Sequence, residues 1–225
     1  MSLTNILIAI NVVAYIWLTS TGGHSSDPAL IDHGALYGVA VLQNGEWWRI
    51  VTGGFLHANT AHIALNMFAL YQVGNIVEEI YGKMRFALIY AVALVGSGLA
   101  VVFISPNQPT VGASGAIFGL FGALVAVGLR MGPQGRGLIG QVLPVIIINL
   151  VFTFAIPNIS ASGHIGGLIT GFLAGLVFYM MPRRREYAYA VAPGEARGDV
   201  ETIEHPPAAG PHEGGPPLEV RDPRE

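Results

Sequence analysis

Residues 112–130 read GASGAIFGLFGALVAVGLR, an apolar run in which no charged residue precedes Arg130. Its glycines at positions 115, 119 and 122 recur at intervals of three and four, so on a helix they share one face. In a membrane, a face of small residues lets two helices approach closely. The run therefore predicts a membrane helix that packs tightly against a neighbour, with Ser114 near its start.

The rest of the chain is also too apolar for a water-soluble domain. Of its 225 residues, 52% are hydrophobic and 11% are charged, whereas soluble domains carry about 25% charged residues. Stretches long enough, or nearly so, to cross about 30 Å of hydrocarbon run over residues 3–19, 58–77, 84–104, 114–130, 138–155 and 164–181. We predict an all-α, six-transmembrane bundle over residues 1–182.

Basic residues orient this bundle, because cytoplasmic loops carry an excess of Lys and Arg. The loops on the opposite side contain only Arg49. The residues on the predicted cytoplasmic side are Lys83, Arg85, Arg130, Arg136, Arg183, Arg184 and Arg185. Both termini are therefore expected in the cytoplasm.

The two ends of the chain differ in character. The first apolar stretch has no basic segment before it and no clear cleavage site, which favours a retained helix over a removed signal peptide. Residues 183–225 are rich in Pro, Gly and Glu and lack periodic apolar residues, so a disordered tail is expected. The chain has no cysteine and no basic patch with interleaved aromatics. We predict no metal, no cofactor and no nucleic-acid partner.

The segment 20–57 is too long for a simple connector. It contains Trp47, Trp48 and Arg49. These residues are consistent with an aromatic belt at the membrane interface. They are equally consistent with a structured loop in the outer leaflet that Arg49 ties together by hydrogen bonds. The sequence leaves both interpretations open.

Polar side chains are rare inside the predicted spans, and each needs a reason because burial in lipid is unfavourable. The absence of charged residues away from the span ends weighs against an ion-coupled transporter. His62 and Asn66, four residues apart, share one helix face, either as interhelical hydrogen-bonding groups or as donors to a developing oxyanion. The sequence does not explain Asn149, for which a simple interhelical hydrogen bond is one interpretation.

Ser114 and His164 are expected at similar depths. Ser114 lies 16 residues before Arg130 and His164 lies 19 residues before Arg183, rises of about 24 and 28 Å. Each begins a glycine-lined helix face, so packing of the two faces would bring the side chains within hydrogen-bond reach. Because the fourth span is short, residues 105–113 must dip below the outer surface, where irregular backbone is tolerated if it lines a wet cavity.

Taken together, these motifs resemble those of the bacterial rhomboid proteases, and the resemblance covers residues 3–181. The matching motifs are Glu46-Trp47-Trp48-Arg49, His62-x-x-x-Asn66, Gly112-x-Ser114-Gly115 and His164-x-x-Gly167-x-x-x-Gly171. Each motif is weak by itself. Their order, spacing and placement on the predicted spans make the combination specific.

The resemblance implies an intramembrane serine endopeptidase with a catalytic Ser114–His164 dyad and no carboxylate. It also implies an oxyanion hole formed by His62, Asn66 and the backbone N–H of Ser114. His57 would have an accessory, water-binding role. Phe118 stands where some family members have a tyrosine that stacks on the catalytic histidine. Gly112 and Gly115 are further accessory positions, and the structural positions would be Glu46, Trp48, Arg49, Gly167 and Gly171.

The implied partners are transmembrane helices of other proteins in the cell membrane, unwound locally before they are cut next to small side chains. Their entry between the second and fifth spans is a family expectation, and Phe68, Phe152 and Phe154 are placed to line that gate. Two alternatives remain at this point: a non-catalytic binder of membrane helices, and a small-molecule transporter. The sequence does not predict an oligomeric state.

Overall fold

The computed structural model describes residues 1–24, 26–157 and 159–181. The predicted tail and the basic residues at 183–185 lie outside the described residues. Within them the chain is helical, and the elements are α1 (Leu3–Ser20), α2 (Asp27–Asp32), α3 (Gly38–Asn44), α4 (Arg49–Thr52), α5 (Thr60–Tyr81), α6 (Lys83–Ile104), α7 (Ser114–Arg130), the 3-10 helix η1 (Gly132–Gly135), α8 (Arg136–Ala155) and α9 (Ala161–Met180).

The six expected apolar stretches coincide with α1, α5, α6, α7, α8 and α9. In the described part of the chain, four helical segments are long and apolar enough to cross a membrane: α1, α6, α9 and the continuous segment Gly132–Ala155. Helix α7 is apolar but has only 17 residues. Helix α5, which carries Asn66, Glu78 and Glu79, is long enough but does not belong to that apolar set.

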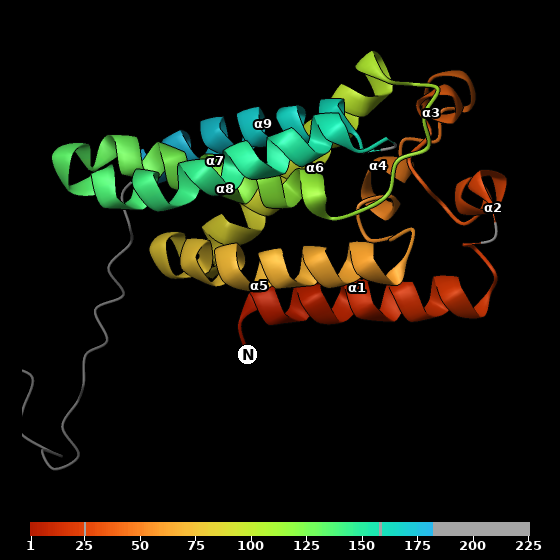
Figure 1. Ribbon diagram of the computed structural model, residues 1–225, viewed down its shortest axis with the longest axis horizontal. Coiled ribbons are helices and arrows are strands. Elements are labelled where there is room, and N and C mark those ends of the chain that lie inside the picture. The colour runs from red at the N-terminus through yellow and green to blue at the C-terminus, as the bar shows by residue number, and fades with distance from the viewer. Residues whose placement is uncertain (25, 158, 182–225) are drawn as a thin grey trace, which may run out of the picture. The chain divides into compact units, whose positions relative to one another are not determined.

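Helix α7 is the central helix of the described part (Figure 1) and packs against α5, α6, α8 and α9. Only four of its residues are not fully buried: Ser114, Val125, Leu129 and Arg130. Helices α6 and α9 pack against each other, and both pack against α7. Helix α1 lies beside α5 (Figure 1). This arrangement explains why α7 can be short, since protein rather than lipid surrounds it.

Helices α7 and α9 touch along their glycine faces. A Cβ atom on Gly167 would lie 1.9 Å from the carbonyl oxygen of Gly115, and one on Gly171 would lie 2.1 Å from that of Gly119. Both distances are far below van der Waals contact, so larger residues would push the helices apart. The register of these pairs places the first turns of α7 and α9 side by side.

Further along the same helices, hydrogen bonds to backbone carbonyls add a second connection. The Tyr81 hydroxyl at the end of α5 lies 3.1 Å from the carbonyl oxygen of Ala123 and 3.0 Å from that of Gly175. Arg85 donates from Nη1 to the carbonyl oxygen of Phe178 at 3.0 Å. Helices α5, α6, α7 and α9 are thus tied together far from the first turns of α7 and α9.

Helix α1 is fixed at its N-terminus by a carboxylate of α5. The Glu78 side chain accepts hydrogen bonds from the backbone N–H groups of Leu3 and Thr4, both at 2.9 Å, and from the Thr4 hydroxyl at 2.8 Å. These N–H groups have no partner within the helix, and a negative charge is favourable at this end. Glu78 therefore docks α1 onto α5.

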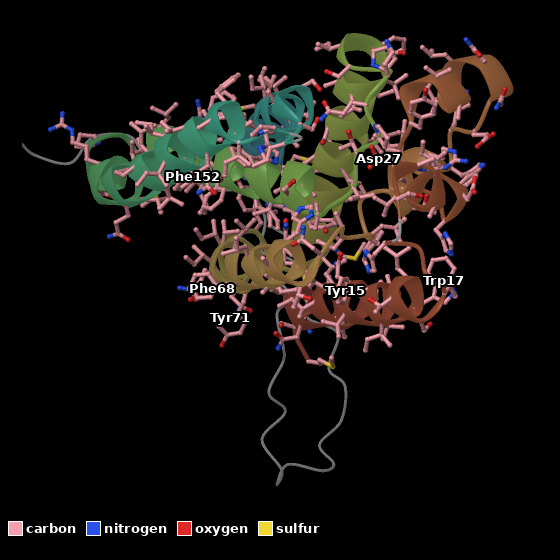
Figure 2. All side chains as sticks on the ribbon, turned by 45° about the vertical axis from the view of Figure 1, so that its right-hand side comes forward. Tyr15, Trp17, Asp27, Phe68, Tyr71 and Phe152 are labelled. Carbon is pink, nitrogen blue, oxygen red and sulfur yellow. The ribbon has the colours of Figure 1, made fainter. Side chains whose placement is uncertain are left out.

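Helix α8 is the least buried of the long helices after residue 80. Its fully buried residues are Val142, Ile146 and Thr153, on the face turned to the bundle. Phe152 on α8 is 54% exposed and Phe68 on α5 is 67% exposed, and both are labelled in Figure 2. Pro144 lies within α8 without ending it, and membrane helices tolerate such a proline.

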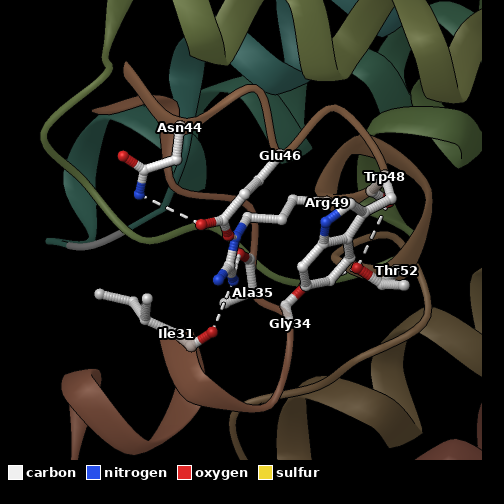
Figure 3. A network of polar contacts seen from close by, with 8 residues as sticks. All are labelled: Ile31, Gly34, Ala35, Asn44, Glu46, Trp48, Arg49 and Thr52. Carbon is white, nitrogen blue, oxygen red and sulfur yellow. Dashed lines mark hydrogen bonds and ion pairs between the residues drawn. The ribbon is translucent and has the colours of Figure 1, made fainter. Parts of the chain in front are cut away.

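The segment between α1 and α5 is folded into the three short helices α2, α3 and α4. Arg49 holds them together: its guanidinium pairs with Glu46 and donates to the carbonyl oxygens of Ile31 and Ala35 (Figure 3). The same guanidinium lies 4.6 Å from the centre of the Trp48 ring. The segment is therefore a structured loop that Arg49 ties together, and its tryptophans are about half exposed. Its position at a membrane interface stays a prediction.

This folded loop also holds the irregular segment that precedes α7. Leu36 and Thr110 exchange backbone hydrogen bonds of 3.0 and 2.8 Å. Two residues later, the N–H of Gly112 donates to the carbonyl oxygen of Gly53 at 2.9 Å. The backbone immediately before Ser114 is therefore fixed from two sides.

Candidate active site

Ser114 and His164 meet across the contact between α7 and α9. The Oγ atom of Ser114 lies 2.8 Å from Nε2 of His164. Ser114 is the first residue of α7, and His164 is in the first turn of α9, whose N-cap is the Ser160 side chain. His164 is 8% exposed. The structure therefore brings together the two residues that the sequence analysis placed at similar depth.

The imidazole of His164 is held on its face and at both nitrogens. The Phe118 ring, one turn after Ser114 on α7, stacks on it with centroids 4.2 Å apart and planes inclined by 16°. At the far edge, Nδ1 of His164 lies 2.7 Å from Oγ1 of Thr153 on α8. The Thr153 hydroxyl in turn donates to the carbonyl oxygen of Asn149 at 2.7 Å.

Thr153 was missed by the sequence analysis. A signal exists in hindsight, because Val142, Ile146 and Thr153 are spaced by four and seven residues and share the one buried face of α8. For Asn149, whose role the sequence left open, the contact found is not the interhelical hydrogen bond considered above. Its side-chain amide donates to the carbonyl oxygen of Val145 at 2.8 Å, four residues back in the same helix, so the bond is intrahelical.

The missing side chain of Gly112 leaves room for the His62 ring near Ser114. The φ of Gly112, 122°, lies in the region that favours glycine. A Cβ atom there would lie 2.7 Å from Nε2 of His62 and 3.7 Å from Oγ of Ser114. The His62 nitrogen and the Ser114 hydroxyl therefore flank the same bare backbone position.

The start of α5 is capped in a way that fixes His62. The Asn59 side chain accepts a hydrogen bond from the His62 N–H at 2.9 Å. Asn66 is buried one turn later and donates from Nδ2 to the His62 carbonyl oxygen at 2.9 Å. Within the described residues, Asn66 makes no hydrogen bond to Ser114 or His164. An amide has two N–H groups, so one donor of Asn66 remains.

His57 lies in the loop before α5 and is fully buried. Its ring meets that of His62 edge-on, with centroids 5.0 Å apart. Burial and, to a smaller extent, the neighbouring His62 together lower the pKa of His57 from 6.5 to about 4. His57 is therefore neutral at physiological pH and packs behind His62.

The backbone at the start of α7 supplies another donor. The first hydrogen bond of this helix runs from the N–H of Ile117 to the carbonyl oxygen of Ala113 at 3.0 Å. The N–H of Ser114 lies outside that ladder, at the helix end where negative charge is favoured. A hydroxyl beside an imidazole nitrogen and an N–H at a helix start form an arrangement that can support nucleophilic acyl transfer.

The polar groups described around His164 are few. In the part of the chain that the structure describes, no three His, Cys, Asp or Glu side chains gather to hold a metal ion. None of the described carboxylates hydrogen-bonds His164. The one group found at Nδ1 of His164 is the neutral hydroxyl of Thr153.

Comparison with known proteins gives the family. Residues 44–181 match the model of the rhomboid domain. That match covers Glu46 and Arg49 of the loop network and every helix from α4 to α9, and the chain belongs to the rhomboid family. Together with its long apolar helices, this makes it an all-helical, multi-pass membrane protein.

Three relatives illustrate the similarity. "Rhomboid protease GluP" of Bacillus subtilis is 44% identical over 76% of this chain and 34% of its own length. "RHOMBOID-like protein 6, mitochondrial" of Arabidopsis thaliana is 34% identical over 67% of this chain and 50% of its own. "Putative rhomboid protease YdcA" of Bacillus subtilis is 35% identical over 64% of this chain and 73% of its own length. The chain thus spans between a third and a half of the first two relatives.

Proposed function

We propose that this chain is an intramembrane serine endopeptidase in which Ser114 is the nucleophile and His164 is the general base. The observation that carries the proposal is the 2.8 Å contact between Ser114 Oγ and His164 Nε2. Stacking on Phe118 and the bond to Thr153 hold the imidazole in place. Relatives named as rhomboid proteases support the same activity.

In the first step, His164 takes the hydroxyl proton as Ser114 Oγ attacks the carbonyl carbon of the scissile bond. The resulting imidazolium then gives that proton to the leaving amine as the C–N bond breaks, which leaves an acyl ester on Ser114. In the second step, His164 deprotonates a water molecule that attacks the ester. The carboxylic acid product leaves and Ser114 regains its proton.

The negative charge that develops on the carbonyl oxygen needs donors already in place. The N–H of Ser114 and the His62 side chain, which flanks Gly112 beside the serine, are proposed for this role. The remaining N–H of Asn66 is proposed as the third donor. Removal of one such donor typically lowers kcat about 10²–10³-fold.

For the membrane arrangement we propose six spans over residues 1–182, with α5 and α7 added to the four apolar segments. Helix α5 has 22 residues, about 33 Å, and α7 spans about 25 Å within a shell of other helices. Basic residues at the ends remote from Ser114, such as Lys83 and Arg130, support cytoplasmic termini in a cell membrane. Residues 183–225 would form a separate tail.

The proposed substrates are single transmembrane helices of other membrane proteins, since such a segment reaches a buried serine from the side. Entry between α5 and α8 is supported by the low burial of α8. Phe68 on α5 and Phe152 and Phe154 on α8 are between 54 and 69% exposed. They are proposed to line this entrance.

A fluorophosphonate probe, which reacts with activated serines, tests the assignment in purified protein. The wild-type chain should be labelled and should cleave single-span substrates, and Ser114→Ala and His164→Ala should abolish both. Ser20→Ala is the matched control, because that hydroxyl lies at the exposed end of α1 and bonds only to its own helix. Folded wild-type protein that neither reacts nor cleaves would support a binder of membrane helices instead.

A further inference from the structure

The hydroxyl of Thr153 contacts the nitrogen of His164 that Ser114 does not use. Oγ1 of Thr153 lies 2.7 Å from Nδ1 of His164, and the two residues are 4% and 8% exposed. In other serine hydrolases an acidic side chain occupies this position and orients the histidine. Here a neutral hydroxyl from α8 takes that place.

The direction of the hydrogen bonds follows from the second partner of Thr153. Its Oγ1 lies 2.7 Å from the carbonyl oxygen of Asn149, which can only accept. A hydroxyl has one hydrogen, so the same oxygen acts as an acceptor toward His164. Nδ1 must then carry the ring proton. Nε2 is left with a free lone pair, 2.8 Å from Oγ of Ser114, as a general base requires.

We propose that Thr153 is a positioning residue that holds His164 in the Nδ1–H tautomer and in the orientation that deprotonates Ser114. The inference rests on the proposed function of the Ser114–His164 pair. Among the described hydrogen bonds, Thr153 Oγ1 contacts His164 and the carbonyl oxygen of Asn149 but not Ser114. It acts through the imidazole alone.

Packing alone does not explain a hydroxyl at this position. The other fully buried residues of α8, Val142 and Ile146, are apolar. The bond to Asn149 already satisfies the Thr153 hydrogen. The group that needs the Thr153 oxygen as an acceptor is the buried Nδ1–H of His164, because an unpaired buried donor is unfavourable. In the opposite tautomer the ring proton would lie on Nε2, between that nitrogen and the serine.

Three variants separate this role from packing. Thr153→Val keeps the shape and removes the hydroxyl, and Thr153→Ser keeps the hydroxyl and removes a methyl group. Thr170→Val is the matched control, since the Thr170 hydroxyl also bonds the carbonyl four residues back, that of Gly166, but does not contact His164. The readouts are kcat and KM for a fluorescent single-span substrate, the rate of fluorophosphonate labelling, and the melting temperature.

Thr153→Val should lower kcat and the labelling rate about 10–100-fold with little change in KM. Thr153→Ser should recover most of this loss, and Thr170→Val should match the wild type. Wild-type kcat in Thr153→Val would overturn the proposal. So would a Thr153→Ser variant as slow as Thr153→Val, because the methyl group and not the hydroxyl would then matter.

A measurement without catalysis separates this proposal from the proposed function. The ¹⁵N chemical shifts of the His164 imidazole, assigned by their loss in His164→Ala, distinguish the two neutral tautomers. We expect Nδ1–H in the wild type and a mixture in Thr153→Val. If the wild type proved inactive, these spectra would still test Thr153, and an Nε2–H wild-type ring would refute its role.

Discussion

The contact between Gly171 of α9 and Gly119 of α7 sets how closely the two helices that carry Ser114 and His164 approach. A Cβ atom on Gly171 would lie 2.1 Å from the Gly119 carbonyl oxygen and 2.3 Å from its Cα, and both are backbone atoms that cannot rotate away. Gly171→Ala must therefore separate the helices or bend one of them.

The size of the effect follows from these distances. Ordinary van der Waals contact begins at 3.4 Å, so the helices must part by about 1.3 Å at this point if they stay straight. The same shift at the first turns would lengthen the 2.8 Å contact between Ser114 and His164 to about 4 Å, beyond hydrogen bonding. Overpacking of this kind costs about 1–3 kcal/mol, and a misplacement of about 1 Å costs about 10²-fold in rate.

The assay compares kcat on a single-span substrate and the melting temperature for Gly171→Ala and Gly140→Ala. Gly140 lies within α8, and a Cβ atom there meets nothing within 4 Å, so this control changes the same atoms without a clash. We expect a loss of about a hundredfold in kcat and a few degrees in melting temperature for Gly171→Ala only. Wild-type kcat in Gly171→Ala, or an equal loss in Gly140→Ala, would refute the reasoning.

Three further predictions concern the loops around the site. Gly112→Ala should lower kcat at least tenfold, because its φ of 122° is strained for alanine and the added Cβ would lie 2.7 Å from Nε2 of His62. The control Gly22→Ala, at a φ of 77° and in open space, should keep wild-type kcat. Equal rates for the two variants would argue against this role of Gly112. Arg49→Lys should lower the free energy of unfolding by about 1–3 kcal/mol, because lysine lacks the planar guanidinium that reaches two carbonyls and a carboxylate. An unchanged melting temperature in thermal unfolding would contradict this prediction. Burial lowers the pKa of His57 to about 4, so the folded protein binds fewer protons than the unfolded chain between pH 4 and 6.5. The stability that His57 contributes is therefore full above pH 6.5 and is lost as the pH falls toward 4. His57→Phe should flatten the melting temperature against pH in that window, and an unchanged slope would count against the assignment.

Much of the helical framework could be predicted from hydrophobicity, because lipid-spanning segments must satisfy their backbone internally and are long and apolar. The predicted stretches for α6 and α7 match the helices within a residue. The second stretch was placed too short, because α5 continues through Glu78 to Tyr81. Glu78 and Tyr81 are polar and therefore suggest a helix end in the sequence. In the structure, Glu78 hydrogen-bonds α1, and Tyr81 hydrogen-bonds α7 and α9.

The meeting of Ser114 and His164 could be predicted because depth and glycine spacing are properties of single helices. The contact of Thr153 with His164 could not, because it depends on how α8 is rotated and tilted against α9. Asn149 shows the same limit, since sequence alone does not tell an intrahelical from an interhelical bond. The fold of the first loop was also undetermined, because the Arg49 hydrogen bonds connect carbonyls that any residue would supply.

The enclosure of α7 has a consequence for how the protein responds to its lipid environment. A helix of 17 residues exposed to lipid would tilt, shift or thin the bilayer when its thickness changed. Because other helices surround α7 on nearly all sides, hydrophobic mismatch acts first on the weakly buried α1 and α8. Ser114 is thereby insulated from bilayer thickness, whereas Thr153, being on α8, is not.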